Sequence, residues 1–158
     1  MNERRTWWQT LAVGAVVLTV AGSATGQTTM MGSGDPVADR QRLMKNNGAN
    51  WTEIQNKAKA DNAEGVAVNA EAIALHAQRI TSLFPQGSLT DKSKAKPEIW
   101  QKWSEFEAAA KNLETRATQL RDLAVAKNAD AVQATVRDFG RQACGTCHTP
   151  FRVPPPQR

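Results

Sequence analysis

The sequence is poor in the side chains that build metal centres. It holds two cysteines and two histidines, whereas a closed zinc site or an iron–sulfur cluster takes about four protein ligands. Cys147 and His148 are adjacent, so on a helix they would project about 100° apart. His76 is distant in sequence, and we expect it to be a partly buried, hydrogen-bonded residue. A four-ligand metal site is therefore disfavoured.

Patterns typical of β-strands and of nucleic-acid surfaces are also missing. No stretch alternates apolar and polar residues with β-branched side chains, which argues against a sheet. No basic run is interleaved with aromatic residues, so the formal charge of +5 does not indicate nucleic-acid binding. A mild positive excess instead favours encounters with anionic partners.

The N-terminal segment, residues 1–26, has the layout of a secretory signal peptide. A basic start, MNERR, precedes the apolar run LAVGAVVLTVAG and the small residues SATG. The run is shorter than the roughly 18 residues that span a bilayer, so we expect a periplasmic protein whose leader is removed at a site that stays open. Residues 27–35 would form a flexible lead-in. Residues 36–158 would form one domain, since roughly 130 residues build a single core.

Apolar residues recur at alternating steps of four and three over most of the remaining chain, which is the pattern of packed amphipathic helices. The pattern predicts helices at about 36–59, 66–84 and 97–127, and a last helix that starts near 128 or 130 and includes Cys147. Pro85 and Gly87 end the second helix, and Pro97 suits the first turn of the third. These segments predict an all-α fold, an antiparallel four-helix bundle, with the cysteines on the last helix.

Cys144 and Cys147 belong to the string CGTCH. A thioredoxin-type dithiol needs its first cysteine at a helix N-terminus after a strand, and this pair lies toward the C-terminal end of a helix. A disulfide between residues three apart closes too short a loop to stabilise the fold much. C-x-x-C-H is the signature of covalent haem attachment, in which the histidine reaches the iron. We therefore predict one haem c, covalently bound on the C-terminal helix.

Several motifs together resemble those of the class II cytochromes c, the family of the cytochromes c′ and their low-spin relatives. They are CGTCHTPFR near the C-terminus, RQRLM in the first helix, SLFP at the end of the second and KPEIWQKWSEF at the start of the third. The resemblance covers essentially the whole mature chain. It implies thioether bonds from Cys144 and Cys147, a proximal iron bond from His148, and a basic residue, Arg152, beside that histidine.

The resemblance also implies roles for two residues of the first helix. Arg40 would pair with a haem propionate, and Met44 would lie over the distal face. Positions 40 and 44 share one helical face because they are one turn apart, and an arginine on an apolar stripe is expected to need an anionic partner. Whether Met44 binds the iron stays open at this point, because flexible methionines also fill gaps in cores.

Two functions are compatible with these expectations. A haem with two strong axial ligands is a one-electron carrier, which would meet periplasmic redox proteins with acidic docking surfaces. This function is favoured because SLFP and RQRLMKNNG resemble the low-spin branch of the family. If Met44 only covers the iron, the protein would bind or sequester NO or CO. Catalysis is not expected, since no distal histidine or acid–base pair is apparent, and a homodimer stays open.

Overall fold

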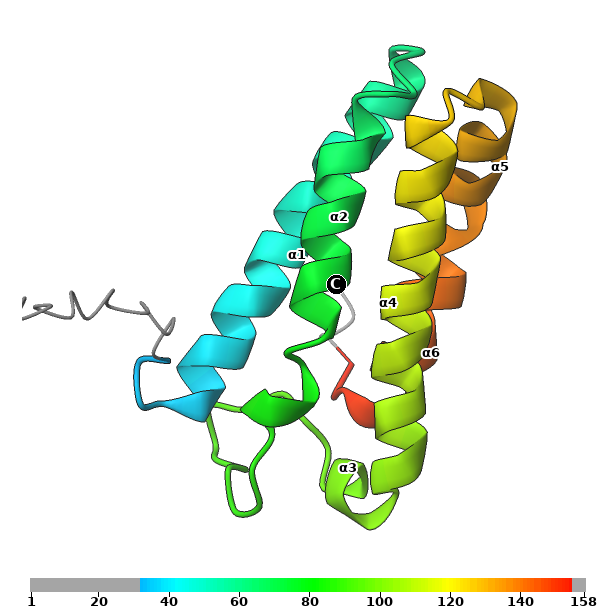
Figure 1. Ribbon diagram of the computed structural model, residues 1–158. Coiled ribbons are helices and arrows are strands. Elements are labelled where there is room, and N and C mark those ends of the chain that lie inside the picture. The colour runs from blue at the N-terminus through cyan, green and yellow to red at the C-terminus, as the bar shows by residue number, and fades with distance from the viewer. Residues whose placement is uncertain (1–31, 155–158) are drawn as a thin grey trace, which may run out of the picture. The chain divides into compact units, whose positions relative to one another are not determined.

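The computed structural model describes residues 32–154, which form an antiparallel bundle of four helices (Figure 1). The helices are α1 (Pro36–Lys59), α2 (Val66–Ala77), α4 (Trp103–Val125), and a last helix composed of α5 (Ala129–Phe139), a π-helical turn (Gly140–Cys144) and α6 (Gly145–Phe151). A 3-10 turn (Thr81–Leu83) and the short α3 (Glu98–Gln101) lie in the connection between α2 and α4. The predicted all-α bundle is confirmed.

The predicted signal peptide and residues 27–31 of the predicted lead-in lie outside the described residues. Within the range 32–154, no helix is both long enough and apolar enough to cross a membrane. The domain boundaries expected at residues 26 and 35 therefore stay predictions.

Helix α1 begins and ends where the sequence pattern places it. The Asp35 carboxylate caps its N-terminus by accepting hydrogen bonds from the Val37 and Ala38 amides at 2.8 and 3.2 Å. Pro36 follows at the first helical position, where its missing amide proton leaves no bond unmade. Lys59 closes the last turn, where a positive side chain interacts favourably with the helix dipole. These local interactions explain why the predicted bounds are confirmed.

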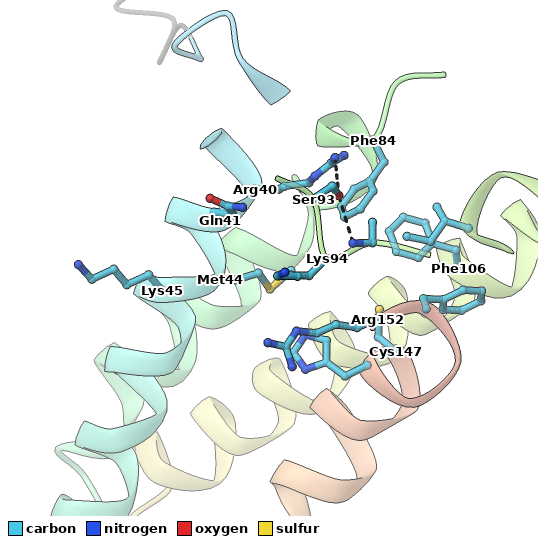
Figure 2. Close-up of a pocket in the computed structure, with 14 residues that line it drawn as sticks. Arg40, Gln41, Met44, Lys45, Phe84, Ser93, Lys94, Phe106, Cys147 and Arg152 are labelled. Carbon is cyan, nitrogen blue, oxygen red and sulfur yellow. Dashed lines mark hydrogen bonds between the residues drawn. The ribbon is translucent and has the colours of Figure 1, made fainter. Parts of the chain in front are cut away.

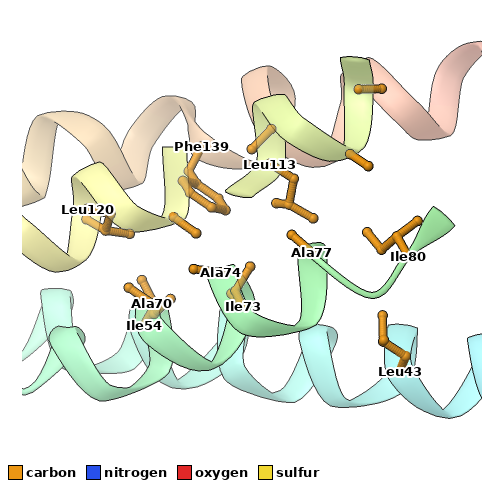
Figure 3. Packing of buried hydrophobic residues seen from close by; sticks show 14 of the residues in the cluster. Leu43, Ile54, Ala70, Ile73, Ala74, Ala77, Ile80, Leu113, Leu120 and Phe139 are labelled. Atoms are coloured by element: carbon orange, nitrogen blue, oxygen red, sulfur yellow. The ribbon is translucent and has the colours of Figure 1, made fainter. Parts of the chain in front are cut away.

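The core lies between the four helices, and nine of the 22 described residues in its buried cluster are alanines (Figure 3). Alanines on the facing sides of α2 and α4 allow these helices to approach closely. The inward stripe predicted over residues 66–84 is buried throughout, namely Val66, Ala70, Ile73, Ala77, Ile80 and Phe84. The predicted helix itself was too long, because α2 ends at Ala77 and its last two stripe residues lie beyond it, before and after the 3-10 turn. Among the largest fully buried side chains are Ile54, Leu120 and Phe139, so all four helices contribute to one core.

The third predicted helix, at about 97–127, is not continuous. Lys102 leaves the helical conformation at φ −123° and ψ 47°, and this separates α3 from α4. Near the kink the Trp100 indole Nε1 donates to the Phe84 carbonyl at 3.0 Å, which ties α3 to the residue that follows the 3-10 turn. Ile99 and Phe106, on either side of the kink, are both buried. The apolar pattern therefore continues across an interruption that it does not reveal.

The last helix also differs from a regular α-helix. The predicted inward stripe is confirmed, because Val132, Phe139 and Ala143 are buried and Val136 and Cys147 pack against the core. The π-helical turn between α5 and α6, however, was not predicted. It ends at the first cysteine of CGTCH, so the unusual backbone lies directly beside the candidate site.

Candidate haem site

A cavity of about 450 Å³ opens between α1, the segment that leads into α3, and α6 (Figure 2). Its apolar lining includes Phe84, Ile99, Phe106 and Phe151, and its charged lining consists of Arg40, Lys45, Lys94 and Arg152. A smaller cavity of about 130 Å³ adjoins it, since Met44, Cys147 and His148 line both. The arrangement suits a ligand with an apolar body and an anionic edge.

The two cysteines lie at the join between the π-helical turn and α6. Both are partly buried, and they are not joined by a disulfide. Burial raises the pKa of the Cys144 thiol, and burial together with the neighbouring Cys144 raises the pKa of Cys147 to about 11. A redox dithiol needs a lowered thiol pKa. The surroundings of these thiols therefore do not suit thioredoxin-type chemistry.

His148 follows Cys147 on α6 and faces both cavities. Partial desolvation, and then the positive charge of Arg152, lower the pKa of the imidazole. A neutral imidazole is the form that binds a metal ion. Within the described chain, no three His, Cys, Asp or Glu side chains gather into a group that could hold a metal on their own.

Met44 lies on α1 and is partly buried against the core. Figure 2 shows its side chain extending from α1 into the space between α1 and the helix that carries Cys147. Met44 and His148 line the same two cavities from opposite elements. The structure thus brings Met44 and His148 to one space, and iron binding by either side chain stays a prediction.

Arg40 is buried, with 5% of its surface exposed. Its guanidinium donates to the Leu83 carbonyl at 3.4 Å, to the Ser88 hydroxyl at 3.0 Å and to the Ser93 hydroxyl at 3.1 Å. It also donates to the Ser88 carbonyl and lies 4.6 Å from the centre of the Phe84 ring. Burial lowers its pKa, an effect that Asp35 opposes.

These contacts correct one step of the sequence argument. An anionic partner is not needed for Arg40 to be buried, because neutral groups of the segment 83–93 accept its hydrogen bonds. Those partners could not be predicted, since nothing in the spacing of Ser88 and Ser93 marks them as arginine ligands. Arg40 also lines the larger cavity, so pairing with a propionate stays a prediction.

Arg152 is exposed at the end of α6 and lines the larger cavity. It forms an isolated antiparallel bridge with Ala95. Beside it the Lys96 amide donates to the Phe151 carbonyl at 3.0 Å, and the Val153 amide donates to the Lys94 carbonyl at 2.8 Å. These bonds, which the sequence did not predict, bring Lys94 to the same cavity as Arg152.

His76 is not part of this site. It is partly buried on α2, and its Nδ1 lies 2.7 Å from the Asn47 side-chain oxygen on α1. The expectation of a hydrogen-bonded structural residue is confirmed.

The comparison with known families decides what this site belongs to. Residues 35–152 match the sequence model of the family described as Cytochrome C′. The chain belongs to the cytochrome c′ family. It is a haem protein with one covalently bound haem c, and its fold is the family's four-helix bundle with the haem on the C-terminal helix.

Individual cytochromes c are similar to most of the chain. Cytochrome c-556 of Agrobacterium fabrum is 31% identical over 120 residues, which are 74% of this chain and 80% of the relative. Cytochrome c-556 of Rhodopseudomonas palustris is 28% identical over 158 residues, covering 90% of this chain and 94% of the relative. The crystal structure of cytochrome c′ from Thermochromatium tepidum matches with a TM-score of 0.70 and 26% identity, over 78% of this chain and 99% of that chain.

The donor set fits haem c. Two partly buried, unlinked cysteines and a histidine lie on one helix at the walls of the two adjoining cavities, and the basic lining of the larger cavity suits a group with acidic propionates. Sequence reasoning missed Lys45 and Lys94 as cavity residues. Lys45 projects about 100° from Met44 on the helix, so adjacency did not mark it. Lys94 reaches the site through the bonds to residues after α6.

Proposed function

We propose that the chain is an exported one-electron carrier in which Cys144 and Cys147 hold the haem and His148 and Met44 bind its iron. The observation that carries this proposal is that Met44 and His148 line the same cavities from α1 and α6. When bound between two strong axial ligands, haem iron changes oxidation state with little rearrangement. A carrier requires that property.

Met44 is supported by a rigid helix. Its neighbour Leu43 is buried in the core, and Arg40, one turn earlier, is bonded to the segment 83–93. These two anchors, which precede Met44 on α1, limit how far the thioether can move away from the cavity. A thioether also favours the ferrous state, which suits a carrier with a raised potential.

The charges at the cavity indicate the kind of redox partner. In the part of the chain that the structure describes, several cations pair with carboxylates, including Arg42, Lys111, Arg121 and Arg141, but Lys45, Lys94 and Arg152 are not among the paired cations. Unneutralised positive charge beside the haem edge would steer a partner with an acidic docking surface.

Lys94→Glu should slow oxidation of the protein by anionic ferricyanide and weaken the salt dependence of that rate. Lys59→Glu, at the far end of α1, should change both less.

Binding or sequestration of NO or CO is the alternative use of the same site. It would require Met44 to cover the iron without binding it. Absorption spectra of the oxidised and reduced holoprotein, recorded with and without CO, separate the two functions. The carrier should be low-spin and unreactive with CO, while a high-spin oxidised spectrum with rapid CO binding would replace the carrier proposal by the gas-binding one.

We also propose that residues 1–26 are removed on export and that residues 36–158 form the cytochrome domain. The support is the basic, apolar and small-residue order of the leader. N-terminal sequencing of the periplasmic protein should begin near Gln27. A product that starts at Met1 and stays with the membrane fraction would contradict this.

A further inference from the structure

Four side chains of the last helix stay on its inward side at a constant spacing of four residues. Phe139, Ala143 and Phe151 are buried, and Cys147 packs against the core. On an α-helix each step of four residues advances about 40° beyond a full turn, so three steps would rotate Phe151 about 120° away from the side of Phe139. A regular α-helix would not keep all four side chains on the core.

The π-helical turn removes most of this rotation. The Gly145 amide donates to the Gly140 carbonyl, five residues earlier instead of four. One extra residue in a turn sets the rest of the helix back by about 100°. The orientation of α6, and with it the direction of Cys147 and His148, therefore depends on this turn.

A side chain of α4 satisfies the disturbed backbone of the turn. The Asn112 amide nitrogen donates to the Gln142 carbonyl at 2.8 Å and lies 3.2 Å from the Thr146 hydroxyl. Thr146 in turn donates to the Ala143 carbonyl at 2.9 Å. π-helical turns are rare and occur mostly as single-turn bulges inside α-helices, and Asn112 supplies a side-chain donor to a backbone carbonyl of this one.

Arg116, one turn further along α4, orients this asparagine. Its Nε donates to the Asn112 side-chain oxygen at 3.0 Å, and its Nη1 donates to the Gln142 side-chain oxygen at 2.7 Å. The Asn112 oxygen is thus directed to Arg116 and its nitrogen to the turn. Asn112 therefore binds the backbone carbonyl of Gln142, and Arg116 binds its side-chain oxygen.

We propose that Asn112 and Arg116 are positioning residues, which hold the π-helical turn and so fix the direction in which Cys144, Cys147 and His148 meet the haem. Neither residue lines the two cavities of the site, so they act through Gln142 and not by touching the haem. The inference rests on the proposed haem attachment at the two cysteines. It does not depend on whether Met44 binds the iron.

The test uses two substitutions in the purified holoprotein. Asn112→Leu keeps the approximate size of the side chain and removes all of its hydrogen bonds. Asn112→Asp keeps the oxygen that accepts from Arg116 and removes the donor to the Gln142 carbonyl. In both variants, amide hydrogen exchange in residues 140–146 should become about tenfold faster, because both lose the hydrogen bond to the Gln142 carbonyl. The Soret circular dichroism should also change, because it reports the orientation of the haem in the protein.

Arg121→Leu is the matched control. Arg121 is also a partly buried arginine of α4, but it bonds Glu71 of α2 at 2.6 Å and does not contact the turn. This variant should retain the wild-type exchange rates in residues 140–146 and the wild-type Soret signal even if its unfolding free energy falls.

Two outcomes would overturn the inference. Wild-type exchange and Soret signals in the Asn112 variants would show that core packing alone sets the turn, and the same changes in Arg121→Leu would show a general loss of stability. If Asn112→Leu does not fold, Asn112→Asp decides. Mass measurement of the wild-type holoprotein separates this test from the proposed function. A chain without attached haem would refute the attachment, but it would not refute the support of the π-helical turn by Asn112 and Arg116.

Discussion

Met44 of α1 and His148 of α6 line the same pair of cavities in the bundle. Each is carried by a helix that packs on the core through its immediate neighbours, Leu43 in one case and Cys147 in the other. The space between the two side chains is therefore set by the packing of whole helices. Substitution of the Met44 or His148 side chain, which leaves this packing intact, should therefore change the haem properties without unfolding the protein.

Covalent attachment is tested by removing the cysteines one at a time. In the wild type, acidified acetone should leave the haem with the protein, and the mass should include one haem. Cys144→Ala and Cys147→Ala should each keep at most one thioether bond and mature in lower yield, whereas the double variant should release all of its haem. Full extraction of haem from the wild type would contradict the attachment.

Arg40→Leu should lower the midpoint potential, because removal of a buried positive charge beside the haem favours the ferric state. It should also cost about 1 to 3 kcal/mol of stability, since the serine and carbonyl groups that Arg40 bonds lose their donor. Redox titration and urea unfolding measure the two effects.

Arg42→Leu is the control for Arg40. Arg42 is exposed on α1 and pairs with Asp39 at 2.8 Å. Such surface arginines contribute little, and without Arg42 the Asp39 carboxylate keeps its hydrogen bonds from Ser33. Its potential and stability should stay close to those of the wild type. If the potential of Arg40→Leu also matched the wild type, Arg40 would serve only to hold the segment 83–93.

His76 should make the stability of the protein depend on pH. Burial, and then the charge of Arg79, lower the pKa of His76 below its ordinary value of 6.5. The unfolded chain then binds a proton more readily than the folded chain, so this contribution to stability is complete above pH 6.5 and is lost as the pH falls toward the folded pKa. Unfolding free energies at pH 7.5 and about pH 5.5 measure the loss.

His76→Gln is the matched variant, because its amide can still donate to the Asn47 oxygen but does not titrate. The unfolding free energy of this variant should fall less between the two pH values than that of the wild type. An identical fall in both proteins would assign the pH dependence to other groups.

The sequence predicts the bundle well because helix burial follows from a repeated pattern. The apolar stripe of each long helix is defined by many residues. The interruption at Lys102 therefore did not prevent the third helix from being predicted. For the same reason the pattern could not reveal that interruption, because Ile99 and Phe106 face the core on both sides of it. Periodicity reports which side of a helix is buried and not where its backbone departs from the regular form.

The π-helical turn did leave a signal in the sequence. Phe139, Ala143, Cys147 and Phe151 are spaced by four residues without the intervening step of three that the other helices show. The partners of Arg40 left no such signal. Ser88 and Ser93 approach it through a connection whose path depends on the packing of Phe84 and Trp100, and such tertiary contacts cannot be derived from local spacing.

The most direct test of the account is whether the sulfur of Met44 binds the iron. The oxidised wild-type holoprotein should be low-spin and should show the weak thioether-to-iron absorption band near the red end of the visible spectrum. In Met44→Ala this band should disappear, the haem should become high-spin, and CO should bind readily, while Leu43→Ala should lose about 2 to 5 kcal/mol of stability but keep the band. A wild-type spectrum that lacks the band and is already high-spin would contradict the account.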